Sequence, residues 1–307
     1  MLFKDKLDYY DQIIKKELEE LLNKAFHTQS HRADLLLLNI NGFHLDKSSK
    51  VRNNPMHPFV FGLGSIGHSE LLHNEFLLEF SRPNVLNIPY SDFKKEREYP
   101  TNTGELNEEL YDKILTLVKK ESYVIQMEML VYLKIWESTL YLKNLYQLVR
   151  LLKGEHYDWF FKLKTANTPN GIATAQELIR KCIRDEIRPF SPILADLIAQ
   201  AYKSQIRNSI AHSNYSMLGR SIYLNNSNNQ YANIESLHFD EWNEMYHISV
   251  ALYNSYNWMK DQISKFYIEK LPNMGHYINL RFTKKDATET QYPVFYDEIR
   301  GWCWVKP

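Results

Sequence analysis

Long stretches in which apolar residues recur at every third or fourth position limit this chain to a mainly helical fold. The clearest stretch covers residues 239–268, with Trp242, Met245, Ile248, Leu252, Tyr256 and Met259 at that spacing. Such spacing places the apolar residues on one face of an α-helix, which can then pack against a core. Only 10 of the 307 residues are glycine, which disfavours turn-rich β-sandwiches and glycine-loop enzymes.

The same pattern predicts helices in the first half of the chain. Residues 2–27 are amphipathic, and residues 106–120 and 121–152 are strongly helical. The last of these helices carries a broad apolar face, formed by Tyr123, Met127, Leu130, Leu133, Trp136, Leu140 and Leu145. We expect it to end before Gly154, because glycine commonly follows the C-terminus of a helix.

Capping residues predict further helices in the second half. Ser191 followed by Pro192 is typical of a helix start, since serine caps the first turn and proline is tolerated in it. We expect that helix to run from Pro192 to about His212. The pattern also predicts a helix over Thr174–Ile187 and a short aromatic helix over residues 155–163.

Strand-like segments are few and lie near the two ends of the chain. Ala33–Ile40 and Val85–Ile88 are short apolar runs that predict strands, and Tyr277–Phe282 and Tyr292–Tyr296 are expected to pair as a hairpin. The remaining segments are expected to be a loop at 46–58, a helix at 68–81 and a linker at 89–107.

The sequence therefore predicts three regions. Residues 1–105 form a small α+β N-terminal region of unknown role, residues 106–270 form a helical domain, and residues 271–307 form a tail with a possible β-hairpin.

Charge and cysteine content narrow the function classes. Lys and Arg total 37 and Asp and Glu total 37, so contact with a nucleic acid should be confined to a local cleft. Cys182 and Cys303 are far apart and form no Cys/His metal spacing, so we expect no disulfide, metal or cofactor. No apolar run approaches the ~20 residues of a membrane span and no signal peptide is evident, which predicts a cytoplasmic protein without a membrane partner.

One short segment contains residue types that can act together in catalysis. The segment Gln205–Tyr215 contains Arg207, Asn208 and His212. On a straight helix Arg207 and His212 would lie about 140° apart, because each residue turns the helix by roughly 100°. They can converge if the helix ends near His212 and the chain turns at Ser213-Asn214, which are turn-forming residues.

This segment resembles the HEPN domain superfamily. Many members are bundles of four or five helices that carry an arginine, a polar residue directly after it, and a histidine four to six residues beyond. Here these positions are Arg207, Asn208 and His212, late in a helix and followed by a loop and one more long helix. The resemblance covers residues 106–270.

The resemblance implies an endoribonuclease that needs no metal. The RNA's own 2′-hydroxyl attacks the neighbouring phosphate, histidine transfers protons near neutral pH, and arginine binds the phosphate. Asn208 would hydrogen-bond the phosphate or fix the tautomer of the histidine. In HEPN nucleases two motifs meet at a dimer interface, so a homodimer is expected. Such proteins often act as toxins or in antiviral defence, which adds an antitoxin or another regulatory partner.

Further residues are candidates for contacting the RNA substrate. Ser213 and Tyr215 follow the motif, and Arg184 and Arg188 share a face with Arg180 on the predicted preceding helix. The alternative for such a stripe is an ordinary solvated surface. The alternative for Arg207 and His212 is a favourable interaction with the helix C-terminus, and for the domain a non-catalytic HEPN module that binds nucleotides or partners.

Two other motifs are weaker candidates for a functional site. Gly62–Gly67 spells GxGxxG and is the main rival site, but the acidic residue expected about 20 positions later is missing. We interpret it as a turn that packs a helix on a small sheet. His27 and His31 are four apart, but no third metal ligand is evident, so we interpret them as helix-end residues.

Overall fold

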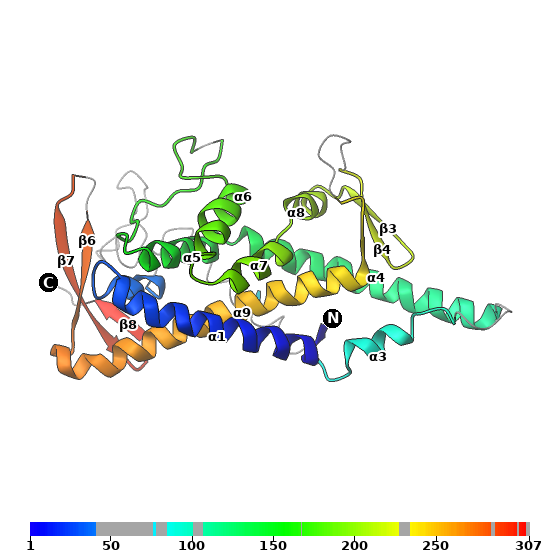
Figure 1. Cartoon of the computed structure of the whole chain (residues 1–307), viewed down its shortest axis with the longest axis horizontal. Coiled ribbons are helices and arrows are strands. Elements are labelled where there is room, and N and C mark those ends of the chain that lie inside the picture. Colours follow the sequence, from blue (N-terminus) through cyan, green and yellow to red (C-terminus); the bar gives the residue numbers. More distant parts are fainter. Residues whose placement is uncertain are drawn as a thin grey trace. The chain divides into compact units, whose positions relative to one another are not determined.

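The fold of the chain is mainly α, with a few short strands (Figure 1). The computed structural model describes residues 1–40, 76–77, 85–100, 107–166, 168–226, 234–283, 286–299 and 301–304. The predicted loop at 46–58, most of the predicted helix at 68–81 and the Gly62–Gly67 motif lie outside these residues.

By contact the chain divides into two compact units. Unit 1 comprises Met1–Ile14, Asn74–Glu137 and Asp196–Asn254, and unit 2 comprises Lys15–His73, Ser138–Ala195 and Ser255–Pro307. The helices α1 (Lys4–Thr28) and α9 (Phe239–Lys270) each supply residues to both. The division of the sequence at residues 105 and 270 is based on composition, and it stays a prediction.

Unit 1 is built around α4 (Glu108–Glu137) and the first half of α9. Its other elements are β1 (Leu2–Phe3), β2 (Val85–Leu86), α3 (Tyr90–Lys95), α8 (Ser204–Ala211), β3 (Tyr215–Leu218), β4 (Ser221–Leu224) and β5 (Ser236–His238). Large aromatic side chains fill the core: Trp242 packs on Tyr132 and Tyr246, and Trp136 donates a 3.1 Å hydrogen bond to Ser249. Burying the indole is favourable because its N–H keeps a partner.

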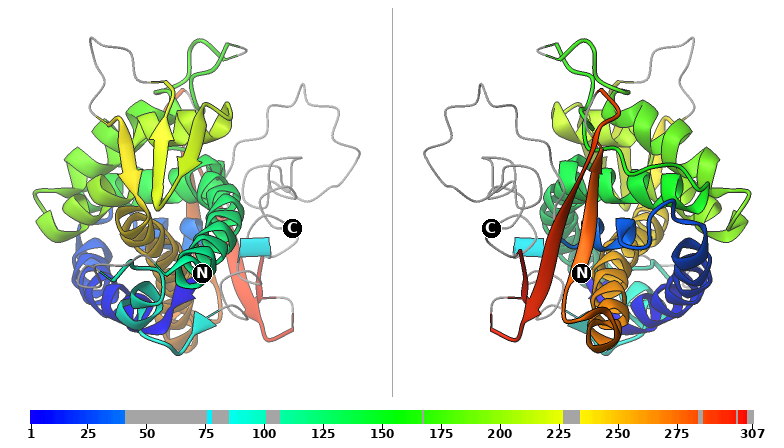
Figure 2. Two further views of the ribbon diagram at one scale, coloured as in Figure 1. Left: turned by 90° about the vertical axis from the view of Figure 1, so that its right-hand side faces the viewer. Right: turned by 90° about the vertical axis from the view of Figure 1, so that its left-hand side faces the viewer.

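The strands of unit 1 form two small sheets. β1 pairs in parallel with β2, and β3, β4 and β5 form an antiparallel sheet in that order, side by side in the left view of Figure 2. The β3–β4 turn holds Gly219 at a φ of 57°, a left-handed conformation that glycine adopts without a side-chain clash.

Unit 2 combines helices with a C-terminal sheet. It contains α5 (Thr139–Leu152), α6 (Ala175–Glu177), the π-helix η2 (Leu178–Asp185), the 3₁₀ helices η1 (Asp34–Leu38) and η3 (Leu271–Met274), and the strands β6 (Ile278–Thr283), β7 (Glu289–Asp297) and β8 (Gly301–Trp304). Asn144 of α5 donates hydrogen bonds to the Leu38 carbonyl and to Tyr256 of α9. These bonds fix η1 between two helices, since buried polar groups need partners.

Several expectations are confirmed. Helix α1 matches the amphipathic segment 2–27, and α9 buries the six apolar residues expected to face inward. The two C-terminal segments pair as an antiparallel hairpin, β6–β7, to which β8 adds a third strand. Leu152 ends α5, and Gly154 follows with a φ of 74°, as expected for a residue after a helix C-terminus.

Other expectations are wrong. Asp34–Leu38 forms a buried 3₁₀ helix where a strand was expected, because a run of buried leucines has no period that separates the two. Residues 155–163 form no helix: the buried side chains there are Tyr157, Trp159 and Phe161, which is the alternation of an extended chain. The expected linker at 89–107 contains the short helix α3.

Two helix boundaries also differ from the expectation. The expected break near residue 120 is absent from α4, which continues to Glu137; Ser138 then caps α5 by accepting a hydrogen bond from the Tyr141 N–H. The expected helix Pro192–His212 is two helices, α7 (Pro192–Ala201) and α8, although Ser191 does cap α7. The chain is interrupted instead at the Ser138 cap and at the extended backbone of Lys203, and neither is evident from the spacing of apolar residues.

Candidate functional site

The candidate motif lies on α8, whose start is fixed by a buried tyrosine of α4. The Tyr132 hydroxyl donates to the carbonyl of Ala201, the last residue of α7, and accepts a 3.4 Å hydrogen bond from the Lys203 N–H. Lys203 has an extended backbone, with φ −121° and ψ 112°, so the chain changes direction before α8 begins. Ile206 and Ile210 then bury one face of α8.

Helix α8 ends at the position that the motif requires. His212 is the C-cap residue, and the following Ser213 has a left-handed φ of 54°. The Ser213 N–H donates to the Ile210 carbonyl, and the Asn214 N–H donates to the Ser209 carbonyl at 2.8 Å. This pair of bonds is a Schellman motif, which reverses the chain after His212. The expectation that the helix ends at His212 is therefore confirmed.

Arg207 is held by two partners in unit 1. Its Nη2 donates a 2.7 Å hydrogen bond to Oε1 of Glu137, the last residue of α4, and its Nη1 donates to Oδ1 of Asn208 at 3.0 Å. The guanidinium remains partly exposed. The position of Arg207 is thus set from α4 as well as from α8, and charge-assisted bonds of this kind restrict its rotamers.

His212 is exposed, and its side chain makes no hydrogen bond or ion pair with another residue that the structure describes. Arg207 and Asn208 are brought together, but neither contacts His212 among the described residues. The structure therefore places the three residues on the last turns of one short helix, with the imidazole accessible from solvent.

The other predicted contact residues fall into two groups. Ser213 and Tyr215 lie directly beyond His212, Ser213 exposed and Tyr215 half-buried as the first residue of β3. Arg184 and Arg188 belong to unit 2, where Arg184 forms an ion pair with Asp185.

The expected stripe of Arg180, Arg184 and Arg188 on one helix face is wrong. Residues 178–185 form the π-helix η2, and Arg188 lies in the turn after it. A π-helix bonds each residue to the one five positions away, so side chains spaced by four no longer stack in one row. The predicted N-terminus is nevertheless well formed, because Thr174 and Glu177 make a capping box.

Sequence reasoning missed two features of the site. Glu137, the partner of Arg207, is 70 residues away in sequence and has no local signal. The sheet β3–β5 directly after the motif was expected only as a loop region. Its signal was the alternation of Tyr215, Met217 and Ile222 around Gly219, which marks a hairpin turn.

An ion-pair cluster fixes the far end of this sheet. Arg220, in the β3–β4 turn, contacts Glu121 of α4 and Asp240 of α9 at 3.2 and 3.1 Å. Asp240 also accepts a 2.6 Å hydrogen bond from the Tyr90 hydroxyl of α3. Although burial opposes ionisation, Tyr90, Arg220 and the other neighbouring charges hold the pKa of Asp240 below its usual value.

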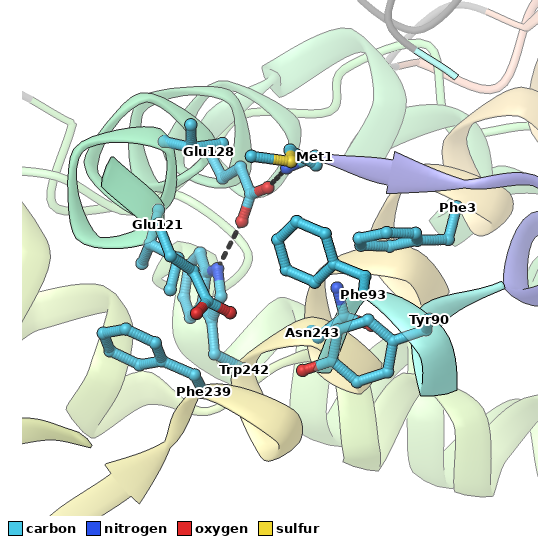
Figure 3. Close-up of a pocket in the computed structure, with 11 residues that line it drawn as sticks. Met1, Phe3, Tyr90, Phe93, Glu121, Glu128, Phe239, Trp242 and Asn243 are labelled. Carbon is cyan, nitrogen blue, oxygen red and sulfur yellow. Dashed lines mark hydrogen bonds and ion pairs between the residues drawn. The ribbon is translucent and has the colours of Figure 1, made fainter. Parts of the chain in front are cut away.

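A small cavity lies in the core of unit 1 (Figure 3). It is lined by Met1, Phe3, Tyr90, Phe93, Glu121, Val124, Ile125, Glu128, Phe239, Trp242 and Asn243. Both carboxylates already have partners: Glu128 accepts a 2.7 Å hydrogen bond from the Trp242 indole, and Glu121 pairs with Arg97 and Arg220. The cavity is thus a small space lined mostly by aromatic and aliphatic side chains, and its two carboxylates are already compensated.

Unit 2 contains a separate polar chain. The Ser30 hydroxyl donates a 3.1 Å hydrogen bond to Asp34 and lies 3.0 Å from Nδ1 of His156. Burial raises the pKa of Asp34 to about 7. These contacts join the end of α1 to η1 and to the loop after α5, and the carboxyl of Asp34 is enclosed.

Potential metal ligands are not clustered in the described part of the chain. Within it, no group of three His, Cys, Asp or Glu side chains is arranged to hold a metal ion. Helix α1 ends at Thr28, so His27 and His31 do not share a helix face, and His27 bonds instead to the Asn23 carbonyl. Cys182 and Cys303 are free thiols.

Comparison with known proteins identifies no relative: the chain matches no protein-family model, no curated protein and no solved structure. In the described part of the chain, no helix combines the length and apolar character needed to cross a membrane.

Proposed function

We propose that this protein is a metal-independent endoribonuclease of the HEPN type, with Arg207 and His212 as catalytic residues and Asn208 in support. The observation that carries the proposal is the end of α8: an exposed histidine on the C-cap, five residues after an arginine that is anchored from a second helix. A general acid–base group must be accessible to substrate, and His212 meets that condition.

The proposed reaction needs only groups of these types. The 2′-hydroxyl of a ribose attacks the adjacent phosphorus, its proton passes to a base, and the bond from phosphorus to the 5′-oxygen breaks. The leaving 5′-oxygen takes a proton from an acid, which leaves a 2′,3′-cyclic phosphate. A histidine with a pKa near neutral can serve as base or acid, and the guanidinium binds the charge that builds up on the phosphorane oxygens.

Glu137 gives Arg207 a defined role in this scheme. Its carboxylate takes one N–H of the guanidinium, which leaves other donors for a phosphate, because arginine has five. The ion pair orients the side chain before substrate arrives. A partly exposed pair of this kind contributes little stability, so a phosphate can share or replace it at small cost.

A homodimer completes the proposed mechanism. One motif supplies one histidine, whereas the reaction is fastest with both a base and an acid. A two-fold axis would bring a second Arg207 and His212 to the same RNA. We place such an enzyme in the cytoplasm, as a toxin or an antiviral effector restrained by an antitoxin or another regulatory partner.

A non-catalytic HEPN module is the second candidate. It is favoured by the Arg207–Glu137 ion pair, which partly neutralises the arginine, and by the lack of contact between Arg207 and His212 among the described residues. Such a module would bind a nucleotide or a protein partner through the same surface.

The products of the reaction test the proposal. Purified protein should cleave RNA in excess EDTA, leave 2′,3′-cyclic phosphate ends, and spare DNA of the same sequence, which lacks the 2′-hydroxyl. Mass spectrometry of the fragments identifies the ends. Dependence on Mg²⁺, or equal cleavage of DNA, would contradict the mechanism and leave the binding module as the better account.

A further inference from the structure

The outer face of the β3–β5 sheet combines an exposed aromatic residue with several serines and has no acidic residue. Side chains alternate along each strand, and the inner row contains the buried Ile222, Leu224 and Leu237. The registers place the other residues on the outer face in two cross-strand rows, Ser216–Tyr223–Ser236 and Leu218–Ser221–His238. None of these six is acidic.

Tyr223 is partly exposed at the centre of this face. It lies on the middle strand, and its side chain is 41% exposed. Both cross-strand neighbours are serines, whose small side chains cannot cover the ring. Its hydroxyl and ring make no hydrogen bond or ring contact with a described residue, so the exposed part of the side chain is open to a ligand.

The sheet is tied to the candidate catalytic motif. β3 begins three residues after His212, and the Asn225 N–H donates a 2.8 Å hydrogen bond to the Asn214 carbonyl. Counted from the end of the sheet that follows His212, the cross-strand pair Tyr215–Leu224 is first and the pair Ser216–Tyr223 is second. Tyr223 therefore lies on the second pair from that end, and successive positions on a strand are about 3.3 Å apart.

We propose that this face is a base-binding subsite, in which Tyr223 stacks on an unpaired base of single-stranded RNA beside the phosphate to be cleaved. This proposal rests on the proposed ribonuclease function and names its substrate as unpaired RNA. Aromatic rings on exposed sheets bind bases by stacking, and neighbouring hydroxyls can hydrogen-bond the base edges or the 2′-hydroxyl.

The three strands of the sheet contain no acidic residue, which is compatible with binding RNA. Two carboxylates lie beside His238, in the row farther from His212. Asp240 is 3.4 Å from the imidazole, and Glu241 accepts a 2.8 Å hydrogen bond from the His238 N–H. Asp240 is already engaged by Arg220 and Tyr90. The row nearest His212 holds only Ser216, Tyr223 and Ser236, none of which is acidic, and the nearest acidic residue in sequence is the exposed Glu235, directly before Ser236. A protein partner would instead favour a continuous apolar patch.

Binding can be measured without cleavage on the full-length His212→Ala protein. The probe is a fluorescein-labelled single-stranded RNA, followed by anisotropy. Tyr223→Ala should raise Kd by about ten-fold or more, the scale for losing one stacked base. Tyr223→Phe should bind normally, because the ring is kept. Ser236→Asp should weaken binding too, by placing a carboxylate beside the ring.

A matched control separates this site from a general loss of aromatic surface. Tyr277 is 49% exposed and belongs to unit 2, and Tyr277→Ala should leave Kd unchanged. Circular dichroism should show that each variant is folded, as expected for exposed positions.

The outcomes distinguish the subsite from the catalytic function. An unchanged Kd in Tyr223→Ala, or no binding of single-stranded RNA at all, overturns the subsite. If wild type cleaves RNA but Tyr223→Ala binds normally, only the subsite fails. If binding depends on Tyr223 but wild type never cleaves RNA, the nuclease proposal fails and the subsite stands.

Discussion

His247 illustrates how a single buried side chain ties distant parts of unit 1 together. Its Nε2 accepts a 2.7 Å hydrogen bond from the Phe3 N–H of β1, so its Nδ1 carries the proton and donates to the Asn243 carbonyl. Burial lowers the pKa of this imidazole to about 3. The side chain is therefore neutral in the folded protein and fully committed to structure, in contrast to the exposed His212.

The low pKa of His247 makes the stability of the folded protein depend on pH. In the unfolded chain the histidine titrates near pH 6.5. Below that pH the unfolded chain binds a proton on His247 that the folded protein does not bind, which favours unfolding. Stability from His247 is therefore complete above about pH 6.5 and falls as the pH drops toward 3. Between pH 6.5 and 5 the loss should be about 2 kcal/mol, at roughly 1.4 kcal/mol per pKa unit.

Urea denaturation at several pH values measures this term. His247→Gln should be less stable than wild type at pH 7.5, and the difference in unfolding free energy should shrink as the pH falls. A difference that stays constant from pH 7.5 to 5 would show that His247 does not carry the acid sensitivity.

At the scale of the element, α8 and its reversal are the part of the site that depends most on local geometry. Ser213 adopts a left-handed φ of 54°, which costs a residue with a side chain up to roughly 1 kcal/mol relative to glycine. Ser213→Gly should therefore raise the free energy of unfolding by about 0.5–1 kcal/mol. Ser213→Val, which is β-branched, should lower it.

The same variants separate the two roles of Ser213. If its hydroxyl contacts RNA, Ser213→Gly should be more stable and less active. If the residue serves only the turn, Ser213→Gly should keep its activity. A loss of stability in Ser213→Gly, measured by thermal unfolding, would contradict the strain argument.

The elements also show what sequence patterns can predict. Helix α9 could be predicted because its apolar period is unbroken over its buried face. The face expected on α4 is partly wrong: Tyr123, Met127 and Leu130 are each more than half exposed, and Glu128 is buried with an indole partner instead. Periodicity fixes the helix, but tertiary contacts decide which face is buried.

The candidate site was only partly predictable for the same reason. The end of α8 at His212 follows from Ser213 and Asn214, which are local turn residues. The contact between Arg207 and Glu137 depends on how α4 and α8 pack, and no local rule reports it. The alternation in β3 and β4 was present but carried serines, so its hydrophobic signal was weak.

For the whole molecule, the proposed function requires a symmetric partner that supplies a second His212 to the same RNA. A shared site would make each active centre depend on two chains. In an equal mixture of wild type and His212→Ala that has re-equilibrated, about one quarter of dimers would carry both histidines, against about half of the sites if each chain worked alone. The mixture thus reports on the dimer with the same variant that tests catalysis.

The most direct test is the rate of RNA cleavage by wild type and by His212→Ala, in excess EDTA and at equal concentration of folded protein. The account predicts a fall of ~10²–10⁴-fold in the variant, the usual contribution of a general acid–base group. Circular dichroism and thermal unfolding should be unchanged, because His212 is exposed. A His212→Ala protein that cleaves RNA as fast as wild type would contradict the central claim.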